Sequence, residues 1–423
     1  MEEKGLKRFP PVEQLVRCVA DEEDVFIVYE DLADSMLSIV AWGAKSIISG
    51  SDAETFERIR SAIKGFSGLE ERSLLRRALF GYVSYDAVRL WENVKDLRPY
   101  PEPWHYAEFF EPENMAVYDH KSGKVFLSIV DDAKLLCRGK VSRNLKAEPY
   151  DSMLKGEEFV DAVNRVLEYI EHGYAFQVVL SRFERFTISG DLTSLYLVLR
   201  HINPSPYTYL LRIGKRAIVG ASPELLFAIS RGAVETYPIA GTRPRGRTHE
   251  EDKRLEEELM NSEKDRAEHL MLVDLARNDL GKVCVPGTVS VEKFMHIKKY
   301  SHVQHLVSKV VGVLRKRIDF IGVLAALLPA GTVSGAPKPF AMNLVEELET
   351  FKRGPYAGAV GYIASPRSGE MAIAIRSAFV YNELLRIQAG AGIVCDSKPW
   401  LELEETEHKL AALKEALRMA ETW

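Results

Sequence analysis

Short runs of apolar residues, typical of β-strands, recur along the whole chain and alternate with segments of helical spacing. The clearest runs cover residues 25–29, 124–130, 234–239, 371–380 and 384–388. Some neighbouring runs are close enough to form hairpins, whereas others are separated by a helix. This mixture predicts an α+β fold with antiparallel sheets rather than a doubly wound parallel sheet.

One polar stretch divides the chain into two regions. Residues 138–150 are rich in charged and polar side chains and are typical of a linker. We therefore predict a boundary between residues 1–148 and residues 149–423. The second region holds nearly all of the glycine-rich and carboxylate-rich segments, so the candidate chemistry lies there.

The composition is that of an ordinary globular protein, with 46% hydrophobic and 28% charged residues among 423. The net charge is −5, which gives no general attraction to nucleic acids or anionic membranes. The first ten residues contain no apolar core of a secretion signal, and the longest apolar run is too short to cross a bilayer.

The cysteines argue against a metal or disulfide scaffold. Cys18, Cys137, Cys284 and Cys395 are widely spaced and form no C-x-x-C pair. This spacing favours neither a zinc site nor a disulfide framework. Reduced thiols, together with the N-terminal sequence, predict a cytoplasmic protein.

Two predicted helices carry a pair of carboxylates on one face. In the first helix Ser262 is the N-cap and Asp265 and Glu268 are three residues apart; in the second, Glu402 and Glu405 have the same spacing. Like charges at this spacing repel unless solvent or a cation compensates them. Two interpretations stay open from spacing alone: two solvated acidic faces, or a magnesium site that takes one carboxylate from each helix.

Other segments are candidates for binding or chemistry. Residues 329–338 form a glycine-rich turn before a helix, and their hydroxyl and backbone N–H groups suit either an anion or a simple helix cap. A hairpin that turns near Asn382 would bring Arg376 roughly opposite Gln388 and beside Gly390, where a guanidinium suits a carboxylate or a nearby acid. The glycine-rich residues 390–392 would come directly after the second strand of this hairpin. His305 lies in an apolar segment and is either structural or a general base.

Taken together, the motifs of the chain closely resemble those of chorismate-utilising enzymes, and specifically the anthranilate synthase component I family. The resemblance covers nearly the whole chain and is strongest between residues 169 and 413. It is carried by the glycine-rich and carboxylate segments above and by four further motifs: Phe176-Gln-Val-Val-Leu-Ser-Arg182, Gly220-Ala-Ser-Pro-Glu224, Pro238-Ile-Ala-Gly-Thr-Arg243 and Glu268-His-Leu-Met-Leu-Val-Asp-Leu-Ala-Arg-Asn-Asp-Leu280.

The resemblance implies a fold and a reaction. The implied fold is α+β, with antiparallel β-sheets packed face to face and helices on the outside. The implied reaction converts chorismate and ammonia into anthranilate and pyruvate with Mg²⁺, in tryptophan biosynthesis. Residues 1–148 would form a regulatory region and residues 149–423 the chorismate-binding catalytic region.

Matching motif positions also imply the roles of individual residues. The metal ligands would be Glu268 and Glu405, with Asp265 and Glu402 behind them through water. The catalytic residues would be Glu224 as general acid, His305 as base for the second step, and Thr332. The chorismate-binding residues would be Gly241, Thr242, Tyr356, Arg376, Gly390, Ala391, Gly392 and Lys409.

Two positions distinguish this chain from related enzymes. Family members that add water carry a Lys base where this chain has Gln177, and aminodeoxychorismate synthases usually carry a nucleophilic Lys where it has Ala240. An amide cannot take a proton from water at neutral pH, and a methyl group cannot form a covalent intermediate. We therefore expect direct attack by ammonia. The alternatives are an aminodeoxychorismate synthase component and an inactive paralogue that only binds an amidotransferase.

The resemblance implies a partner and a regulator as well. The sequence has no Gly-x-Cys-x-Gly nucleophile turn, so ammonia is expected from a separate glutamine amidotransferase subunit, component II. Family members inhibited by L-tryptophan carry a Leu-Leu-Glu-Ser motif, which matches residues 28–31 with Asp31 in place of Ser. Their Pro-Tyr-Met motif matches Pro206, Tyr207 and Thr208, which with Asp31 would form a tryptophan site.

Overall fold

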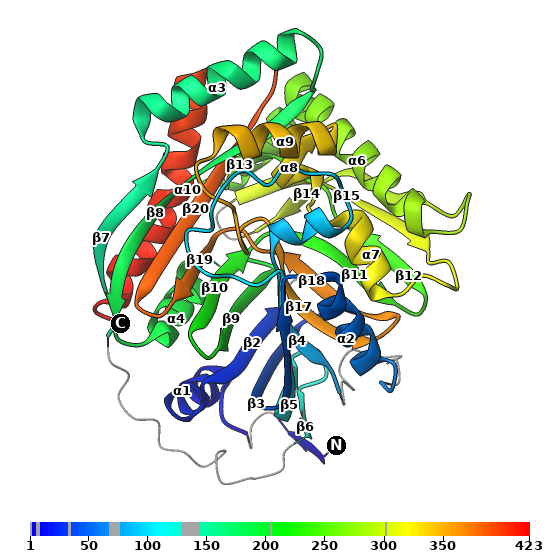
Figure 1. Cartoon of the computed structure of the whole chain (residues 1–423), viewed down its shortest axis with the longest axis vertical. Helices are drawn as coiled ribbons and strands as arrows, with labels where there is room; N and C mark the ends of the chain where they lie inside the picture. The colour runs from blue at the N-terminus through cyan, green and yellow to red at the C-terminus, as the bar shows by residue number, and fades with distance from the viewer. Residues whose placement is uncertain are drawn as a thin grey trace.

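The computed structural model describes residues 2–5, 9–32, 35–66, 77–128, 144–203, 205–300 and 303–423. In these residues twenty strands are joined by hydrogen bonds into one network (Figure 1). Every pairing between these strands is antiparallel. The prediction of an α+β fold with antiparallel sheets is therefore confirmed.

The network has two arms that meet at the long strand β5 (Ala107–Asp119), which pairs with β6 through one half and with β4 through the other. The first arm runs, in order of pairing, through β1 (Glu2–Gly5), β6 (Lys124–Ser128), β5, β3 (Leu37–Gly50), β2 (Val25–Asp31), β9 (Tyr207–Ile213), β10 (Arg216–Ser222), β19 (Ser377–Tyr381), β20 (Leu384–Ile393), β8 (Gln177–Ser189) and β7 (Lys146–Met153), with β16 (Gly335–Ala336) beside the start of β8. The second arm runs through β4 (Leu79–Val83), β17 (Ala359–Ser365), β18 (Ser368–Ile373), β11 (Leu225–Ser230), β12 (Ala233–Thr236) and β15 (Val303–Val313), which pairs with β13 (Ile239–Pro244) and β14 (Ser290–Lys299).

The two arms pack face to face around a large apolar core that includes side chains from both. The ring of Tyr29 on β2 lies edge-on to that of Tyr362 on β17, with 6.0 Å between the ring centroids. Its hydroxyl donates a 3.0 Å hydrogen bond to Glu370 on β18, so a buried polar contact also joins the arms. The implied face-to-face packing is confirmed.

Helices cover the outer faces of both arms (Figure 1). A second apolar cluster packs the first arm against α1 (Val12–Glu22), α4 (Leu192–Ile202) and α10 (Pro399–Ala420). A third cluster packs β8 and β20 against α3 (Gly156–Glu171) and α9 (Lys338–Leu348). The second arm carries α6 (Glu263–Val283) and α7 (Phe320–Leu327), whereas α2 (Ala53–Ile63) lies where the arms meet and contacts β3, β5 and β17. The remaining elements are α5 (His249–Asn261), the short α8 (Gly331–Ser334) and the 3-10 helix at Tyr85–Leu90.

The two regions predicted from the sequence share both arms. In the first arm β2 pairs with β9, and in the second arm β4 pairs with β17. Residues 129–143, which include part of the predicted linker, lie outside the described residues. The boundary at residue 148, and the regulatory role of what precedes it, stay predictions.

Three local expectations need correction. Residues 371–380 form two strands, because β18 ends at Ile373 and β19 begins at Ser377. The hairpin at Asn382 is confirmed, but Ala378 pairs with Ile387, so the register brings Ser377 rather than Arg376 opposite Gln388. Residues 390–392 lie inside β20 and not after it, because β20 continues pairing with β8 to its end.

The cysteine prediction is only partly right. Cys284 and Cys395 are free thiols, whereas Cys18 is disulfide-bonded. Cys137 lies outside the described residues. Wide spacing in the sequence does not exclude a disulfide, because the fold can bring distant residues together. Among the described residues, no helix combines the length and apolar character that crossing a membrane requires.

Candidate active site

A cavity of about 240 Å³ lies between the two arms and is open to solvent on one side. Its walls come from β8, β13, β15 and β20, from α6, α8 and α10, and from the segments next to β10 and β19. Most of the residues implied by the family motifs line this cavity: Glu224, Gly241, Thr242, Glu268, His305, Thr332, Tyr356, Arg376, Gly390, Glu405 and Lys409. Segments more than 200 residues apart in the sequence are thus brought together.

Two neighbouring crossovers between the arms carry Glu224 and Arg376. Glu224 lies between β10 and β11, and Arg376 lies between β18 and β19. The crossovers are hydrogen-bonded to each other: the N–H of Ala221 donates to the carbonyl of Arg376 at 3.2 Å, and the N–H of Ile373 donates to that of Glu224 at 3.0 Å. Arg376 has φ +52°, a conformation that costs a non-glycine residue energy and often occurs at functional sites. This crossover explains why the expected single strand is split.

Glu224 has the properties of a general acid. Its carboxyl group is buried, and burial raises its pKa to about 8, although a hydrogen bond from Thr332 lowers it. The Thr332 hydroxyl donates to Oε1 at 2.9 Å. A carboxyl group with this pKa carries a proton at neutral pH and can donate it to a leaving group.

The paired carboxylates converge on the cavity from two helices. Burial, and after it the negative charges of Asp265 and Glu405, raise the pKa of Glu268. Gln177 donates a hydrogen bond from Nε2 to Glu268 at 3.2 Å, and Lys409 donates one from Nζ to Glu405 at 2.6 Å. This excess of negative charge is the environment that a hard cation with oxygen ligands compensates.

The outer pair of carboxylates lies off the cavity. Asp265 forms an ion pair with Arg243 at 3.0 Å, and Glu402 is almost completely buried on α10. Among the described residues, no group of three or more His, Cys, Asp or Glu side chains could enclose a metal ion. One carboxylate from each helix, with water and substrate oxygens, is the kind of set that Mg²⁺ accepts. The residues therefore fit the ion, and its binding stays a prediction.

His305 on β15 is held by its neighbours. Nδ1 lies 3.1 Å from the carbonyl oxygen of Gly241 and 3.0 Å from the hydroxyl oxygen of Thr242. A carbonyl only accepts, so we assign the ring proton to Nδ1 and leave Nε2 with a lone pair. Burial lowers the pKa of His305, so the ring is neutral at pH 7 and able to act as a base.

Cations and backbone groups suit an anionic substrate. Arg376 and Lys409 both line the cavity, and Lys409 also donates to the carbonyl of Gly390 at 2.8 Å. Two predicted binding residues do not line it. Ala391 packs into the core behind β20, and Gly392 lies against the amide of Gln177, which an added Cβ would approach to 2.7 Å.

The motif comparison missed the support beneath the cavity. Arg353 is buried and ion-paired with Glu349 at 2.7 Å. Its guanidinium also donates to the carbonyls of Val179 and Val333, each at 2.7 Å, and both of these residues line the cavity. Gln388, another lining residue, donates to Ser181, which in turn donates to Glu349. A single arginine in a polar sequence gives no sign of this role.

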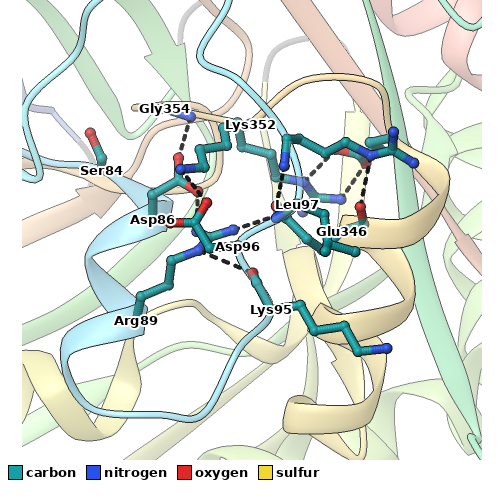
Figure 2. A network of polar contacts seen from close by, with 12 residues as sticks. Ser84, Asp86, Arg89, Lys95, Asp96, Leu97, Glu346, Lys352 and Gly354 are labelled. Atoms are coloured by element: carbon teal, nitrogen blue, oxygen red, sulfur yellow. Dashed lines mark hydrogen bonds and ion pairs between the residues drawn. The ribbon is translucent and has the colours of Figure 1, made fainter.

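A second polar network connects the segment after β4 to the turn that carries Tyr356. Figure 2 shows Asp86 and Arg89 of the 3-10 helix beside Glu346 of α9. The Asp86 carboxylate accepts from the N–H of Gly354 at 2.7 Å and is ion-paired with Arg89. Arg89 also pairs with Glu346, which accepts from the N–H of Leu97 at 2.8 Å. The N-terminal region thereby holds one wall of the cavity in position.

The four residues of the expected tryptophan site lie together at the junction of β2 and β9. Asp31 is directly opposite Tyr207 in this pairing, and Thr208 is opposite the buried Glu30. Pro206 and Tyr207 line a small hollow together with Pro223, which also lines the active-site cavity. The expected regulatory residues are therefore adjacent to the catalytic ones, and tryptophan binding stays a prediction.

Comparison with known proteins identifies the class. A model of the family described as chorismate binding enzyme matches residues 24–415, so the chain belongs to the chorismate-binding enzyme family. Within it, the chain is 50% identical over 421 residues to anthranilate synthase component 1 of Saccharolobus solfataricus, a match that covers 99% of each chain. It is 47% identical over 394 residues to anthranilate synthase component 1 of Aeropyrum pernix, covering 90% of this chain and 87% of that relative.

Solved structures agree with this class. The crystal structure of anthranilate synthase component I from Streptococcus pneumoniae matches with a TM-score of 0.79 at 32% identity, covering 89% of this chain and 92% of that one. The menaquinone-specific isochorismate synthase MenF of Escherichia coli shares the fold, with a TM-score of 0.78 at 21% identity, covering 98% of this chain and 94% of that one.

Proposed function

We propose that this chain is the ammonia-using component of an anthranilate synthase and converts chorismate and ammonia into anthranilate, pyruvate and water, as a step of tryptophan biosynthesis in the cytoplasm. One observation carries the proposal: a protonated buried carboxyl group, Glu224, and the paired carboxylates Glu268 and Glu405 face the same cavity. The cations Arg376 and Lys409 beside them suit the two carboxylates of chorismate.

The first step joins ammonia to the ring. The ammonia nitrogen attacks C2, the two ring double bonds shift, and the C4–O bond breaks. Glu224 gives its proton to the departing hydroxyl, which leaves as water. Mg²⁺ held by Glu268 and Glu405 would supply positive charge to the ring carboxylate. The new ammonium group loses one proton, so the step is balanced.

The second step forms the aromatic ring. His305 takes the proton from C2 through Nε2, the electron pair of the C–H bond enters the ring, and the C3–O bond breaks. The enolpyruvyl group leaves and becomes pyruvate after it gains a proton. Thr242 and Gly241 keep the imidazole of His305 oriented, because both contact Nδ1.

One side chain, rather than the fold, disfavours the rival function of an aminodeoxychorismate synthase component. Ala240 lines the cavity, where a Lys would form a covalent intermediate with the ring. We expect Ala240→Lys to divert product from anthranilate toward an aminodeoxychorismate-type product, which chromatography of the reaction mixture measures. Ala240→Leu is the matched control for added volume. Unchanged anthranilate output from the Lys variant would contradict this role of position 240.

The partner component is part of the proposal. Neither free cysteine suits a glutaminase, because Cys284 is buried and Cys395 is not in a Gly-x-Cys-x-Gly turn. The test follows anthranilate fluorescence with purified chain, chorismate and Mg²⁺. Ammonium should support the reaction with release of pyruvate, whereas glutamine should not until a glutamine amidotransferase subunit is added. Consumption of chorismate without fluorescence would favour aminodeoxychorismate or isochorismate formation, and no consumption would favour the non-catalytic paralogue.

We also propose that L-tryptophan binds beside Asp31, Pro206, Tyr207 and Thr208 and inhibits the reaction. The adjacency of this site to Pro223, the residue before Glu224, supports coupling between the two. Isothermal titration calorimetry should detect binding, and Tyr207→Ala should weaken it about tenfold or more because an aromatic contact is lost. Absence of binding heat at millimolar tryptophan would remove this part of the proposal.

A further inference from the structure

Glu224 borders two cavities, which lie on opposite sides of it. A second, smaller cavity of about 40 Å³ lies behind it, between α6, α7, α8 and the start of β11. We call it the small cavity, and Glu224, Thr236, Leu275, Ala276, Asp279 and Thr332 are among the residues that line it. Glu224 and Thr332 line both cavities, so this hydrogen-bonded pair forms part of the wall between them.

The proposed function gives this arrangement a task. Glu224 loses its proton in each turnover and needs another before the next. Bound chorismate would fill the active-site cavity and keep solvent from that side. The Thr332 hydroxyl stabilises the carboxylate by a hydrogen bond but is too weak an acid to restore its proton. A second contact with water would let Glu224 regain its proton while substrate or product still fills the active-site cavity.

The small cavity suits water and little else. Its volume is enough for about two or three water molecules and too small for a metabolite. Buried waters need two to four polar partners, and the hydroxyls of Thr236 and Thr332 and the carboxyl groups of Glu224 and Asp279 are available around it.

The far end of the small cavity leads to solvent. Asp279 is held in place by Lys338 at 2.8 Å and by Lys282 at 2.9 Å, and the side chain of Lys282 is 52% exposed. Leu275 and Ala276 on α6 are half-buried, so the apolar side of the small cavity also reaches the surface.

We propose that the small cavity holds ordered water that returns a proton to Glu224 after each turnover, with Thr236 and Asp279 holding the water in place. The transfer balances: a hydronium ion from solvent gives a proton through the water chain to the Glu224 carboxylate, which leaves neutral water and a carboxyl group. This inference rests on the proposed function for its purpose, but its physical basis, water in the small cavity, can be tested separately.

The first test is a crystal structure of the full chain at a resolution that shows buried water. We expect at least one ordered water within hydrogen-bond distance of Glu224 in the small cavity, bonded also to Thr236 or Asp279. A dry small cavity in a crystal that shows other buried waters would overturn the inference, whether or not the chain makes anthranilate. Absence of anthranilate from the wild-type chain would instead remove the proposed function.

The second test fills the small cavity. Ala276→Leu should lower kcat about tenfold and raise the solvent deuterium isotope effect on kcat, while the KM for chorismate stays within about twofold. Ala412→Leu, the same change on an exposed position of α10, is the matched control. Thr236→Val keeps the side-chain shape and removes one hydroxyl, so it tests the water without overpacking the cavity; a threefold or larger fall in kcat is expected.

Two results of the second test would overturn the inference. One is that Ala276→Leu and Thr236→Val both show the same kcat and the same solvent isotope effect as the control Ala412→Leu. The other is an increase in the KM for ammonium, with kcat restored at saturating ammonium, because that would make the small cavity an entrance for ammonia rather than a source of protons.

Discussion

Replacing Glu268 by Gln is expected to reduce anthranilate formation by about 1,000-fold or more, which corresponds to about 4 kcal/mol of transition-state stabilisation. Glu405→Gln should have a comparable effect. Each change keeps the size of the side chain but removes one of the two carboxylates that would hold Mg²⁺ at the cavity. The measurement is the initial rate of fluorescence at saturating chorismate and ammonium over a range of Mg²⁺ concentrations.

The control for this prediction lies on the same helix. Glu404 is next to Glu405 but points to solvent, with 60% of its side chain exposed, so Glu404→Gln should keep the wild-type rate. Thermal unfolding should show that the Glu268 variant remains folded, because removing the Glu268 carboxylate relieves its repulsion from Asp265 and Glu405. EDTA should stop the wild-type reaction, and added Mg²⁺ should restore it. Near-normal turnover by either active-site variant would show that the metal assignment is wrong.

The second large effect is expected at Glu224. Glu224→Gln cannot donate a proton and should lower kcat by about 100- to 10,000-fold. In the wild-type enzyme the acid must be protonated, and its pKa is raised to about 8. Activity should therefore be retained through neutral pH and fall as the pH rises through about 8. The pH profile of kcat/KM from pH 6 to pH 10 measures this fall in activity at high pH, the alkaline limb.

Replacing Thr332 tests whether the alkaline limb reports the pKa of Glu224. Its hydrogen bond lowers the pKa of Glu224, so Thr332→Val should move the alkaline limb to higher pH while the fold is kept. Glu224→Gln should lose the limb altogether in its residual activity. An unchanged limb in the Gln variant would assign the titration to another group, and near-normal activity of that variant would exclude Glu224 as the acid.

The sequence predicted the parts of the fold that depend on local signals. The Ser262 hydroxyl caps α6 by accepting from the N–H of Asp265 at 3.2 Å, as the capping pattern indicates. The hairpin at Asn382 is present as well. The motifs predicted most of the cavity, because their residues are drawn from segments that carry recognisable glycine, carboxylate and histidine patterns.

The remaining features depend on the tertiary structure. The sequence does not predict the supporting role of Arg353, because its guanidinium is surrounded by carbonyl groups and Glu349 only where β8, α8 and α9 meet. The split of residues 371–380 arises from the crossover between the arms. The side chain of Ala391 faces the core rather than the cavity, because residues 390–392 continue β20 and strand alternation turns Ala391 away from the ligand side; its role in binding stays a prediction.

The pairing of β4 with β17 has a consequence for biosynthesis of the protein. Val83 lies opposite Ala359 in the second arm, so its partner emerges from the ribosome 276 residues later. At typical rates of translation this delay lasts about 14 to 55 s. During that time β4 has an unpaired edge, which is a template for aggregation. The nascent N-terminal half of this chain is therefore expected to depend on chaperones or on transient contacts until the last third has been made.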